Sequence, residues 1–274
     1  MAINNPLQKY FRQPKIFIKI PSGGVYCQTG TISGDPSKLA VFGMTGMDEI
    51  LLKTPDALLS GESVVRIIES CVPEIKDAWD LSNIDIDAVL SAIRIATYGQ
   101  SMSVTRNCQS CGEENDYDLD LSYIIDHYSK CVYNSRLVLD DLVVTVNPLT
   151  YRQMTDFNLR NFEIQQQLKQ LDLEDKANKK ILADMFIQLG ELQNEIFAAS
   201  IESVSTDSVT VTERGHIIEW VQNADMVLFD QLKELAVSNQ QNWEIPQFDV
   251  VCSHCNAEGK TAIQLDAASF FAKA

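Results

Sequence analysis

Four cysteines stand in two Cys-x-x-Cys pairs, and thiolate sulfur is one of the ligands that zinc prefers in proteins. The first pair is Cys108 and Cys111, and the second is Cys252 and Cys255. A tight turn that carries such a pair points both sulfurs the same way, so two facing turns make a tetrahedral sulfur cage. The four cysteines are therefore predicted to bind one structural zinc ion.

Each pair is predicted to lie in a turn between two strands. Apolar and β-branched residues flank both pairs, and Gly112 and Asn256, which suit tight turns, follow them. About 140 residues separate the pairs, so the pattern predicts a zinc ribbon that is split by a long insertion. Closing such a loop costs on the order of 4 kcal/mol, whereas zinc binding to thiolates is worth roughly 10–16 kcal/mol. The metal is therefore strong enough to hold the two halves together.

Other roles for the cysteine pairs fit less well. A thioredoxin-like redox pair lies between a strand and a helix, and neither pair does. A catalytic zinc keeps one open position, which four thiolates do not leave. His254 remains an alternative ligand because it lies inside the second pair. The carboxylates after the first pair are expected to be solvated rather than to bind metal: Glu113, Glu114, Asp116 and Asp118.

Composition narrows the class of protein. The chain has 274 residues, of which 45% are hydrophobic, so it can bury a large core. A formal charge of −16 argues against nucleic acid as the main partner, because phosphate binding needs Lys and Arg. We expect no membrane-spanning helix and no secretory signal. Seven cysteines, an odd number, suit a reducing compartment with a metal site better than a disulfide framework.

The N-terminal part is expected to form a small β unit and then a helical segment. Residues 1–44 are predicted to hold a polar arm that orders on a partner, a strand at 15–20 and a returning strand at 25–27. In the helical segment, 45–100, we expect a helix capped by Thr45 and another over 62–71. A third helix is expected to begin after Ser82, with Asp85 at the capping-box position, and to end at Gly99. A further short helix is expected over 120–130, after the first cysteine turn.

The later part of the chain is divided by the ribbon. Residues 101–150 are assigned to the first ribbon half and a hairpin at 137–146, residues 151–240 to a helical insertion, and residues 241–274 to the second ribbon half and a C-terminal helix. Residues 203–211 are expected to link two helices. Residues 239–242 are expected to form a polar hinge before the second ribbon half. The overall fold class is therefore α+β, with a small N-terminal β unit, helical segments and a split zinc ribbon.

The insertion carries a heptad seam with two polar interruptions, which indicates either one long helix or a helical hairpin with its turn at 173–178. The seam, at 164–196, is expected to face a partner chain, which can be a second copy of this chain. The alternative is that the seam is buried in the core of the chain itself. Its residues are Ile164, Leu168, Leu171, Asp175, Asn178, Leu182, Met185, Leu189, Leu192 and Ile196.

Three stretches together resemble the T4-type tailed-phage baseplate protein family, which includes a baseplate hub subunit and a hub assembly factor. They are MTGMDEILLKTPDALLSGESVVRIIESCVPEIKDAW, DIDAVLSAIRIATYG and the first cysteine turn with its Gly-Glu-Glu-Asn. The resemblance covers residues 14–125 well and the rest loosely; Trp243, Pro246 and the second cysteine pair fit the longer members. It implies a role in contractile-tail morphogenesis and carries over no catalytic residue.

The sequence therefore predicts a non-enzymatic protein of the hub region of a phage tail baseplate, which binds other baseplate, hub or tail proteins. Its expected location is the virion tail baseplate, and the host cytoplasm during assembly. The alternative is an assembly chaperone that is absent from the mature virion. A zinc-dependent enzyme or a nucleic-acid-binding protein fits less well, because of the four-thiolate site and the acidic charge. We expect neither nucleic acid nor a membrane among its partners.

Overall fold

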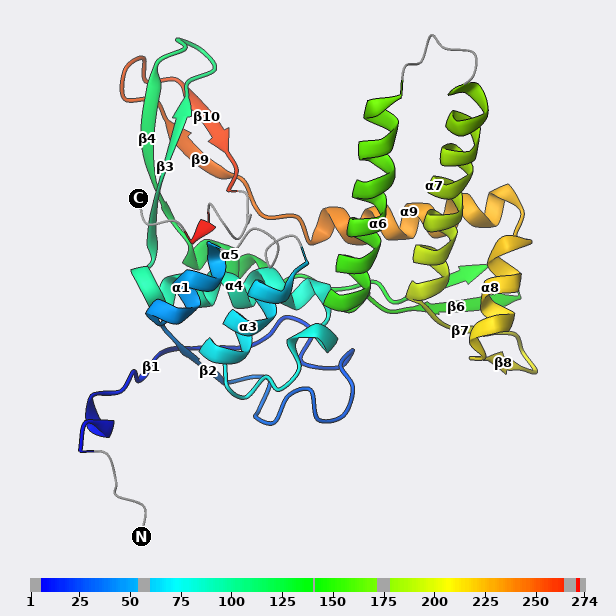
Figure 1. Cartoon of the computed structure of the whole chain (residues 1–274), viewed down its shortest axis with the longest axis horizontal. Coiled ribbons are helices and arrows are strands. Elements are labelled where there is room, and N and C mark those ends of the chain that lie inside the picture. The colour runs from blue at the N-terminus through cyan, green and yellow to red at the C-terminus, as the bar shows by residue number, and fades with distance from the viewer. Residues whose placement is uncertain (1–5, 54–59, 140, 172–177, 264–269, 272–274) are drawn as a thin grey trace. The chain divides into compact units, whose positions relative to one another are not determined.

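The chain divides into two units, and the second interrupts the first. The computed structural model describes residues 6–53, 60–139, 141–171, 178–263 and 270–271. Unit 1 comprises Met1–Cys131 and Ile245–Ala274, and unit 2 comprises Val132–Glu244. Both contain helices and small antiparallel sheets, which confirms the α+β class (Figure 1). The hairpin expected at 137–146 belongs to unit 2, whereas the sequence assigns it to the same segment as the first ribbon half.

A two-stranded sheet begins unit 1. Strand β1 (Pro14–Ile18) pairs antiparallel with β2 (Leu39–Phe42). The returning strand predicted at 25–27 is wrong, because residues 21–27 form turns instead. Gly23 and Gly24 both have positive φ, 65° and 75°, so the chain curls here rather than extending into a strand.

An N-terminal arm precedes this sheet and is anchored by one side chain. The short 3₁₀ helix η1 (Gln8–Tyr10) lies in the arm. The Arg12 guanidinium donates hydrogen bonds to the Gly43 carbonyl oxygen at 2.8 Å and to the Ser70 carbonyl oxygen at 2.6 Å. It also lies 3.5 Å from the Asp48 carboxylate, so it ties the base of the arm to the body of unit 1.

Helix α4 forms the centre of unit 1. It packs against both strands and against helices α3 and α5. Most of its side chains are buried, including Val89, Ala92 and Ile93 at 0% exposure. Burial on almost every side explains why this helix is apolar over most of its surface. The helices of the unit are α1 (Gly46–Leu52), α3 (Glu62–Cys71), η2 (Ala78–Asp80), α4 (Asn83–Tyr98) and α5 (Ser122–Tyr128).

The two expected helix caps have different outcomes. Thr45 forms a capping box with Asp48 at the start of α1, so this cap is confirmed. At α4, Ser82 is the N-cap residue, but its side chain makes no capping bond. Asp85 instead accepts hydrogen bonds from the Ser22 backbone N–H, at 2.7 Å, and the Ser22 hydroxyl, at 2.5 Å. The capping-box prediction for Asp85 is wrong, because the carboxylate is used to bind the turn after β1.

Burial affects the charge state of this carboxyl group. Asp85 is 0% exposed, and burial raises its pKa from 3.8 to about 6. The folded chain therefore favours the protonated form of Asp85. The resulting stabilisation is full below pH 3.8 and is lost as the pH rises through about 6.

A four-stranded antiparallel sheet forms the base of unit 2, in the order β5-β6-β7-β8. The first two strands form the predicted hairpin; Asp140, at its turn, lies outside the described residues. The link predicted over 203–211 is wrong, because this stretch supplies most of the two further strands. Ile201 and Val204 of the first of these strands are buried in the core of unit 2, which explains why this stretch joins the sheet. The strands are β5 (Arg136–Leu139), β6 (Leu142–Val146), β7 (Ile201–Ser205) and β8 (Thr210–Val211).

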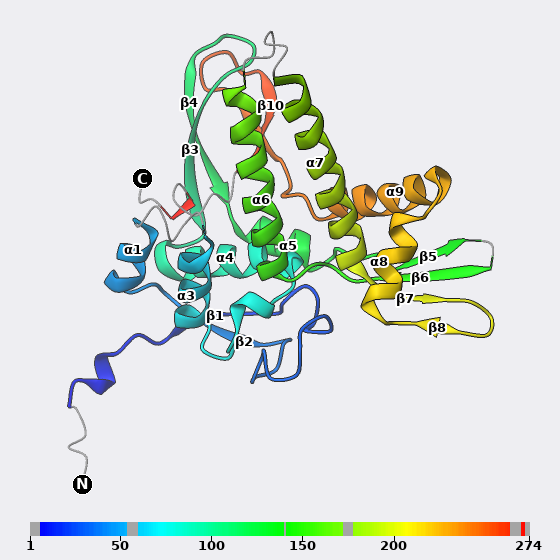
Figure 2. The ribbon, with the colours of Figure 1, turned by 45° about the vertical axis from the view of Figure 1, so that its right-hand side comes forward.

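Four helices complete unit 2. Helices α8 and α9 cover one face of the sheet, where Ile217 and Leu232 pack with Val144. Helices α6 and α7 are separate and lie side by side in both views (Figures 1 and 2). Of the two forms that the heptad pattern allows, the structure has the hairpin; residues 172–177, which join its helices, are outside the described part. The helices are α6 (Tyr151–Gln170), α7 (Asn178–Ser200), α8 (Arg214–Gln222) and α9 (Met226–Asn242).

The heptad seam lies inside this hairpin. Leu192 of α7 is 3% exposed and packs with Leu149 and Phe157, and Met185 is buried as well. Ile164 and Ile196 pack at the edge of the same cluster. The described seam residues are thus buried or half-buried within the chain, because two antiparallel helices bury each other's apolar stripes; Asp175 lies outside the described residues.

The predicted polar hinge at 239–242 is wrong, because these residues form the last turn of α9. Asn239 is 4% exposed, and its side-chain amide pairs with the backbone of Asn134. The Asn134 N–H donates to Asn239 Oδ1 at 2.9 Å, and Asn239 Nδ2 donates to the Asn134 carbonyl oxygen at 2.9 Å. This amide clamp holds the two ends of unit 2 together.

No described helix combines the length and the apolar character that crossing a membrane requires.

Candidate metal centre

Two β-ribbons that are far apart in the sequence carry the four cysteines, and they lie side by side in both views (Figures 1 and 2). Strands β3 (Ser101–Asn107) and β4 (Glu114–Asp120) make the first ribbon, and β9 (Phe248–Val251) and β10 (Glu258–Thr261) make the second. Both ribbons are antiparallel. Each cysteine pair lies in the turn between its two strands, as the sequence predicts.

The two turns have the same hydrogen-bond pattern. In the first, the Cys108 N–H donates to the Glu113 carbonyl oxygen, and the Gly112 N–H donates to the Cys108 carbonyl oxygen. In the second, the Cys252 N–H donates to the Ala257 carbonyl oxygen, and the Asn256 N–H donates to the Cys252 carbonyl oxygen.

The residue after each pair has a left-handed backbone, with φ of 79° at Gly112 and 56° at Asn256. Glycine and asparagine tolerate this conformation best. This explains why a glycine follows one pair and an asparagine the other.

The four sulfurs converge into one cluster. All of them lie within 4.8 Å of one another. Cys108 Sγ is 3.7 Å from Cys255 Sγ, and Cys111 Sγ is 3.7 Å from Cys252 Sγ, so each short contact joins one ribbon to the other. A regular tetrahedron with zinc–sulfur bonds of about 2.3 Å has sulfur–sulfur edges of about 3.8 Å. The cluster therefore has the dimensions that a four-thiolate zinc site needs.

Backbone N–H groups favour the thiolate form of the first cysteine in each pair. The N–H groups of Cys255 and His254 donate to Cys252 Sγ at 3.5 and 3.4 Å. These bonds, with that of Cys255 the stronger cause, lower the pKa of Cys252 from 9.0 to about 6. At the first turn, the N–H groups of Cys111 and Ser110 lower the pKa of Cys108 in the same way. Such sulfurs are prepared to bind a cation.

A polar contact joins the two turns independently of the sulfurs. Asn115, on β4, is 4% exposed. Its Oδ1 accepts hydrogen bonds from the backbone N–H of Ser253 at 2.9 Å and from the Ser253 hydroxyl at 2.8 Å. Its Nδ2 donates to the Glu113 carbonyl oxygen at 3.0 Å. This asparagine latch lies directly beside the cluster; an isolated asparagine in a strand carries no signal by which the sequence could have revealed it.

The other candidate ligands are not brought together. Within the described residues, the metal-binding cluster contains the four cysteines without the imidazole of His254. The acidic side chains after the first pair are exposed, as expected. The remaining cysteines lie apart from the cluster; Cys71 is fully buried, and its burial raises its pKa to about 12. Cys131 Sγ lies 3.5 Å from His127 Nε2.

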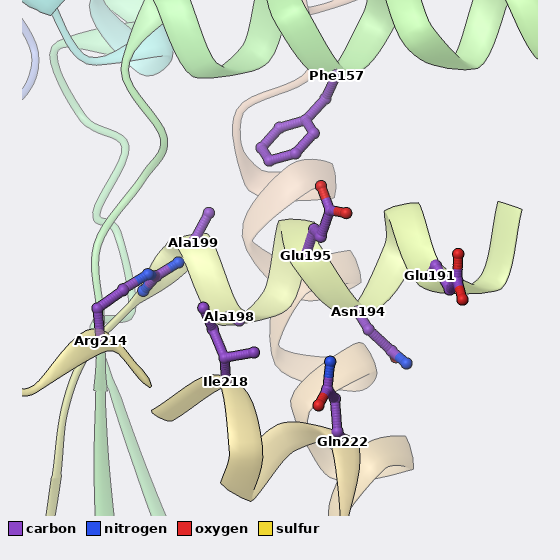
Figure 3. A pocket seen from close by; sticks show the side chains of 9 residues that line it. All are labelled: Phe157, Glu191, Asn194, Glu195, Ala198, Ala199, Arg214, Ile218 and Gln222. Atoms are coloured by element: carbon purple, nitrogen blue, oxygen red, sulfur yellow. The ribbon is translucent and has the colours of Figure 1, made fainter. Parts of the chain in front are cut away.

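Unit 2 contains a pocket of about 500 Å³ between helices α6, α7 and α8 (Figure 3). Phe157 and Ile218 line it together with polar side chains. Glu195, one of its carboxylates, accepts a hydrogen bond from Arg160 at 2.6 Å, which lowers the pKa of Glu195. This carboxylate is thus engaged in joining α6 to α7.

Comparison with known proteins identifies one family. A family model described as T4 bacteriophage base plate protein matches residues 14–272 of the chain. No curated protein and no solved structure gives a match. The matched range covers both units and both cysteine ribbons.

Proposed function

The chain belongs to the T4 bacteriophage base plate protein family, and from this premise we propose that it is a structural or assembly protein of the hub region in which one zinc ion closes the split ribbon. The convergence of four sulfurs from turns 141 residues or more apart carries the zinc proposal. Cys108, Cys111, Cys252 and Cys255 are the proposed ligands. Four thiolates fill the coordination shell, so the ion is structural rather than catalytic.

The zinc would join the two segments of unit 1 that flank the inserted unit in the sequence. Unit 2 leaves unit 1 after Cys131 and rejoins it at Ile245. The amide clamp of Asn239 holds the ends of unit 2 together, and one ribbon half precedes unit 2 in the chain while the other follows it. A metal bond between the two ribbon halves would resist separation of these ends, so that unit 2 stays attached at both sides while it binds other proteins.

Unit 2 offers apolar side chains for such contacts. Phe186 and Ile187 of α7 are 60% and 59% exposed, and Phe162 of α6 is 49% exposed. Large exposed apolar residues on adjacent helices are typical of protein–protein interaction sites. We propose that this outer face of the helical hairpin, rather than the covered heptad seam, binds other baseplate or tail proteins. Neither proposal assigns an enzymatic activity, and the proposed locations remain the tail baseplate and, during assembly, the host cytoplasm.

Co-purification with the other baseplate proteins tests the role of the hairpin. Phe186→Ser combined with Ile187→Ser should abolish capture of partners, while Gln188→Ser, an exposed neighbour, should leave it unchanged. Equal capture by all variants would contradict the proposed interface. Mass spectrometry of intact virions separates the two roles: a structural subunit is present at a fixed copy number, and an assembly chaperone is absent.

A further inference from the structure

The N-terminal segment is basic in an otherwise acidic protein. The first 34 residues contain Lys9, Arg12, Lys15 and Lys19 and no Asp or Glu, whereas the whole chain has a formal charge of −16. Arg12 is engaged in anchoring the arm, but the three lysines are exposed and form no ion pair within the described residues. Positive charge is thus concentrated at one place on the surface.

Exposed aromatic rings accompany these lysines. Tyr10 is 73% exposed and Phe17 is 58% exposed. The ammonium group of Lys9 lies 4.9 Å from the centre of the Tyr10 ring, and that of Lys38 lies 5.3 Å from the centre of the Phe17 ring. Aromatic residues are enriched at the centre of protein interfaces, where aromatic area supplies much of the affinity, and charged residues around them steer association.

The exposed residues lie on one side of the chain along strand β1 and Lys19, the residue that follows it. Lys15, Phe17 and Lys19 alternate with more buried residues along the chain, so their side chains point to the same side. We call these three residues, together with Lys38, the basic face. Lys15 and Lys19 are four residues apart, which in an extended chain corresponds to about 13 Å.

Strand β4 carries the complementary charges with the same spacing. Glu114, Asp116, Asp118 and Asp120 are all exposed and occupy alternate positions, so they too share one side of a strand. We call these four residues the acidic face. Carboxylates four residues apart on it are also separated by about 13 Å.

Hydroxyl groups of β3 hold two of these carboxylates in place. Ser103 donates to Asp118 and Thr105 donates to Asp116, each at 2.5 Å. The acidic face is therefore ordered as well as exposed.

The two faces of one chain do not meet. Both are exposed to solvent, and in both views strand β1 lies in the lower part of unit 1 while the β3–β4 ribbon rises above it (Figures 1 and 2). We propose that the basic face is a docking surface for a second copy of this chain, and that it binds the acidic face of that copy. The contact joins unlike surfaces, so one copy of a bound pair keeps a free acidic face and the other keeps a free basic face, and association proceeds beyond a dimer to a ring or an open chain.

The charge of the whole molecule determines how this association depends on salt. Two copies with a charge of −16 repel each other at long range, whereas the lysines of the basic face and the carboxylates of the acidic face attract at short range. At an ionic strength of about 0.15 M, the Debye length is about 8 Å, so the long-range repulsion is screened more than the contacts. At about 0.5 M the contacts weaken too, and we expect at least a tenfold loss of association.

Sedimentation velocity of the full chain, at concentrations of roughly 1 to 100 µM, tests the proposal. The wild type should form species larger than a dimer at about 0.15 M salt. Lys15→Glu with Lys19→Glu should be monomeric, and so should Asp116→Lys with Asp118→Lys. A control that changes the charge equally elsewhere, Lys179→Glu with Lys180→Glu on α7, should associate as the wild type does.

Mixing and recombining the variants makes the test specific. The intact faces of the two monomeric variants are complementary to each other, and so are their two reversed faces, so an equal mixture should again form species larger than a dimer. A chain with both pairs of reversals should associate again, because its charges are exchanged but remain complementary. A wild type that is monomeric throughout, or association that neither pair of reversals weakens, would overturn the proposal. Zinc content should be the same in every variant, which separates this inference from the proposed metal site.

Discussion

Replacement of Asn115 by alanine should weaken metal binding without removing any proposed ligand. The substitution removes three hydrogen bonds, two from Ser253 and one to the Glu113 carbonyl oxygen. Each is worth about 0.5–1.5 kcal/mol net, and solvent replaces part of this because Ser253 is exposed. A loss of about 2 kcal/mol in holding the two turns together corresponds to roughly 30-fold in metal affinity, within the 10–100-fold typical of residues that support ligands.

Competition with a chromogenic chelator measures this affinity, and substitution with Co²⁺ reports whether four thiolates still bind the ion. Asn107→Ala is the matched control, since Asn107 lies on the same ribbon and is exposed. Asn115→Asp should have a smaller effect than alanine, because a carboxylate still accepts both bonds from Ser253 but cannot donate to the Glu113 carbonyl oxygen. If Asn115→Ala and Asn107→Ala bind zinc equally well, the latch does not position the cluster and the reasoning is refuted.

Three further substitutions test other parts of the structure. Cys111→Ser should lower the melting temperature far more than Cys27→Ser, because it removes a metal ligand; equal shifts in thermal unfolding would argue against the metal site. Asp85→Asn should raise stability at pH 8 by roughly 3 kcal/mol, from a pKa of about 6 against 3.8, and the gain should vanish toward pH 4; a gain that does not depend on pH in denaturant titrations would contradict the assigned burial. Leu192→Ala should destabilise unit 2 by about 2–5 kcal/mol, the exposed Gln193→Ala should not, and neither substitution should change zinc content; a loss of self-association without loss of stability would return the seam to a partner role.

The parts of the molecule that follow from local spacing were predictable from the sequence. The cysteine turns, the cap at Thr45 and the helix over 62–71 depend on residues only a few positions apart. Local chemistry determines such features because the backbone geometry of a turn or a helix end is set by its own side chains.

The features that depend on distant partners were not predictable in this way. Asp85 stands at a capping-box position, but its carboxylate bonds Ser22, which lies 63 positions away. Asn115 and Asn239 show no local signal, although both join segments more than 100 residues apart. The heptad seam was recognisable as an apolar stripe, but periodicity does not tell whether a neighbouring helix or another chain covers it.

The metal content of the purified wild-type chain tests the central claim most directly. Protein prepared under reducing conditions and analysed by inductively coupled plasma mass spectrometry should contain one zinc ion per chain, and Cys252→Ser with Cys255→Ser should contain none. Iron in place of zinc would keep the sulfur cluster but refute the assigned ion, because tetrahedral sulfur sites also accept iron. A folded wild-type chain with no bound metal and four freely titratable thiols at the cluster would contradict the account.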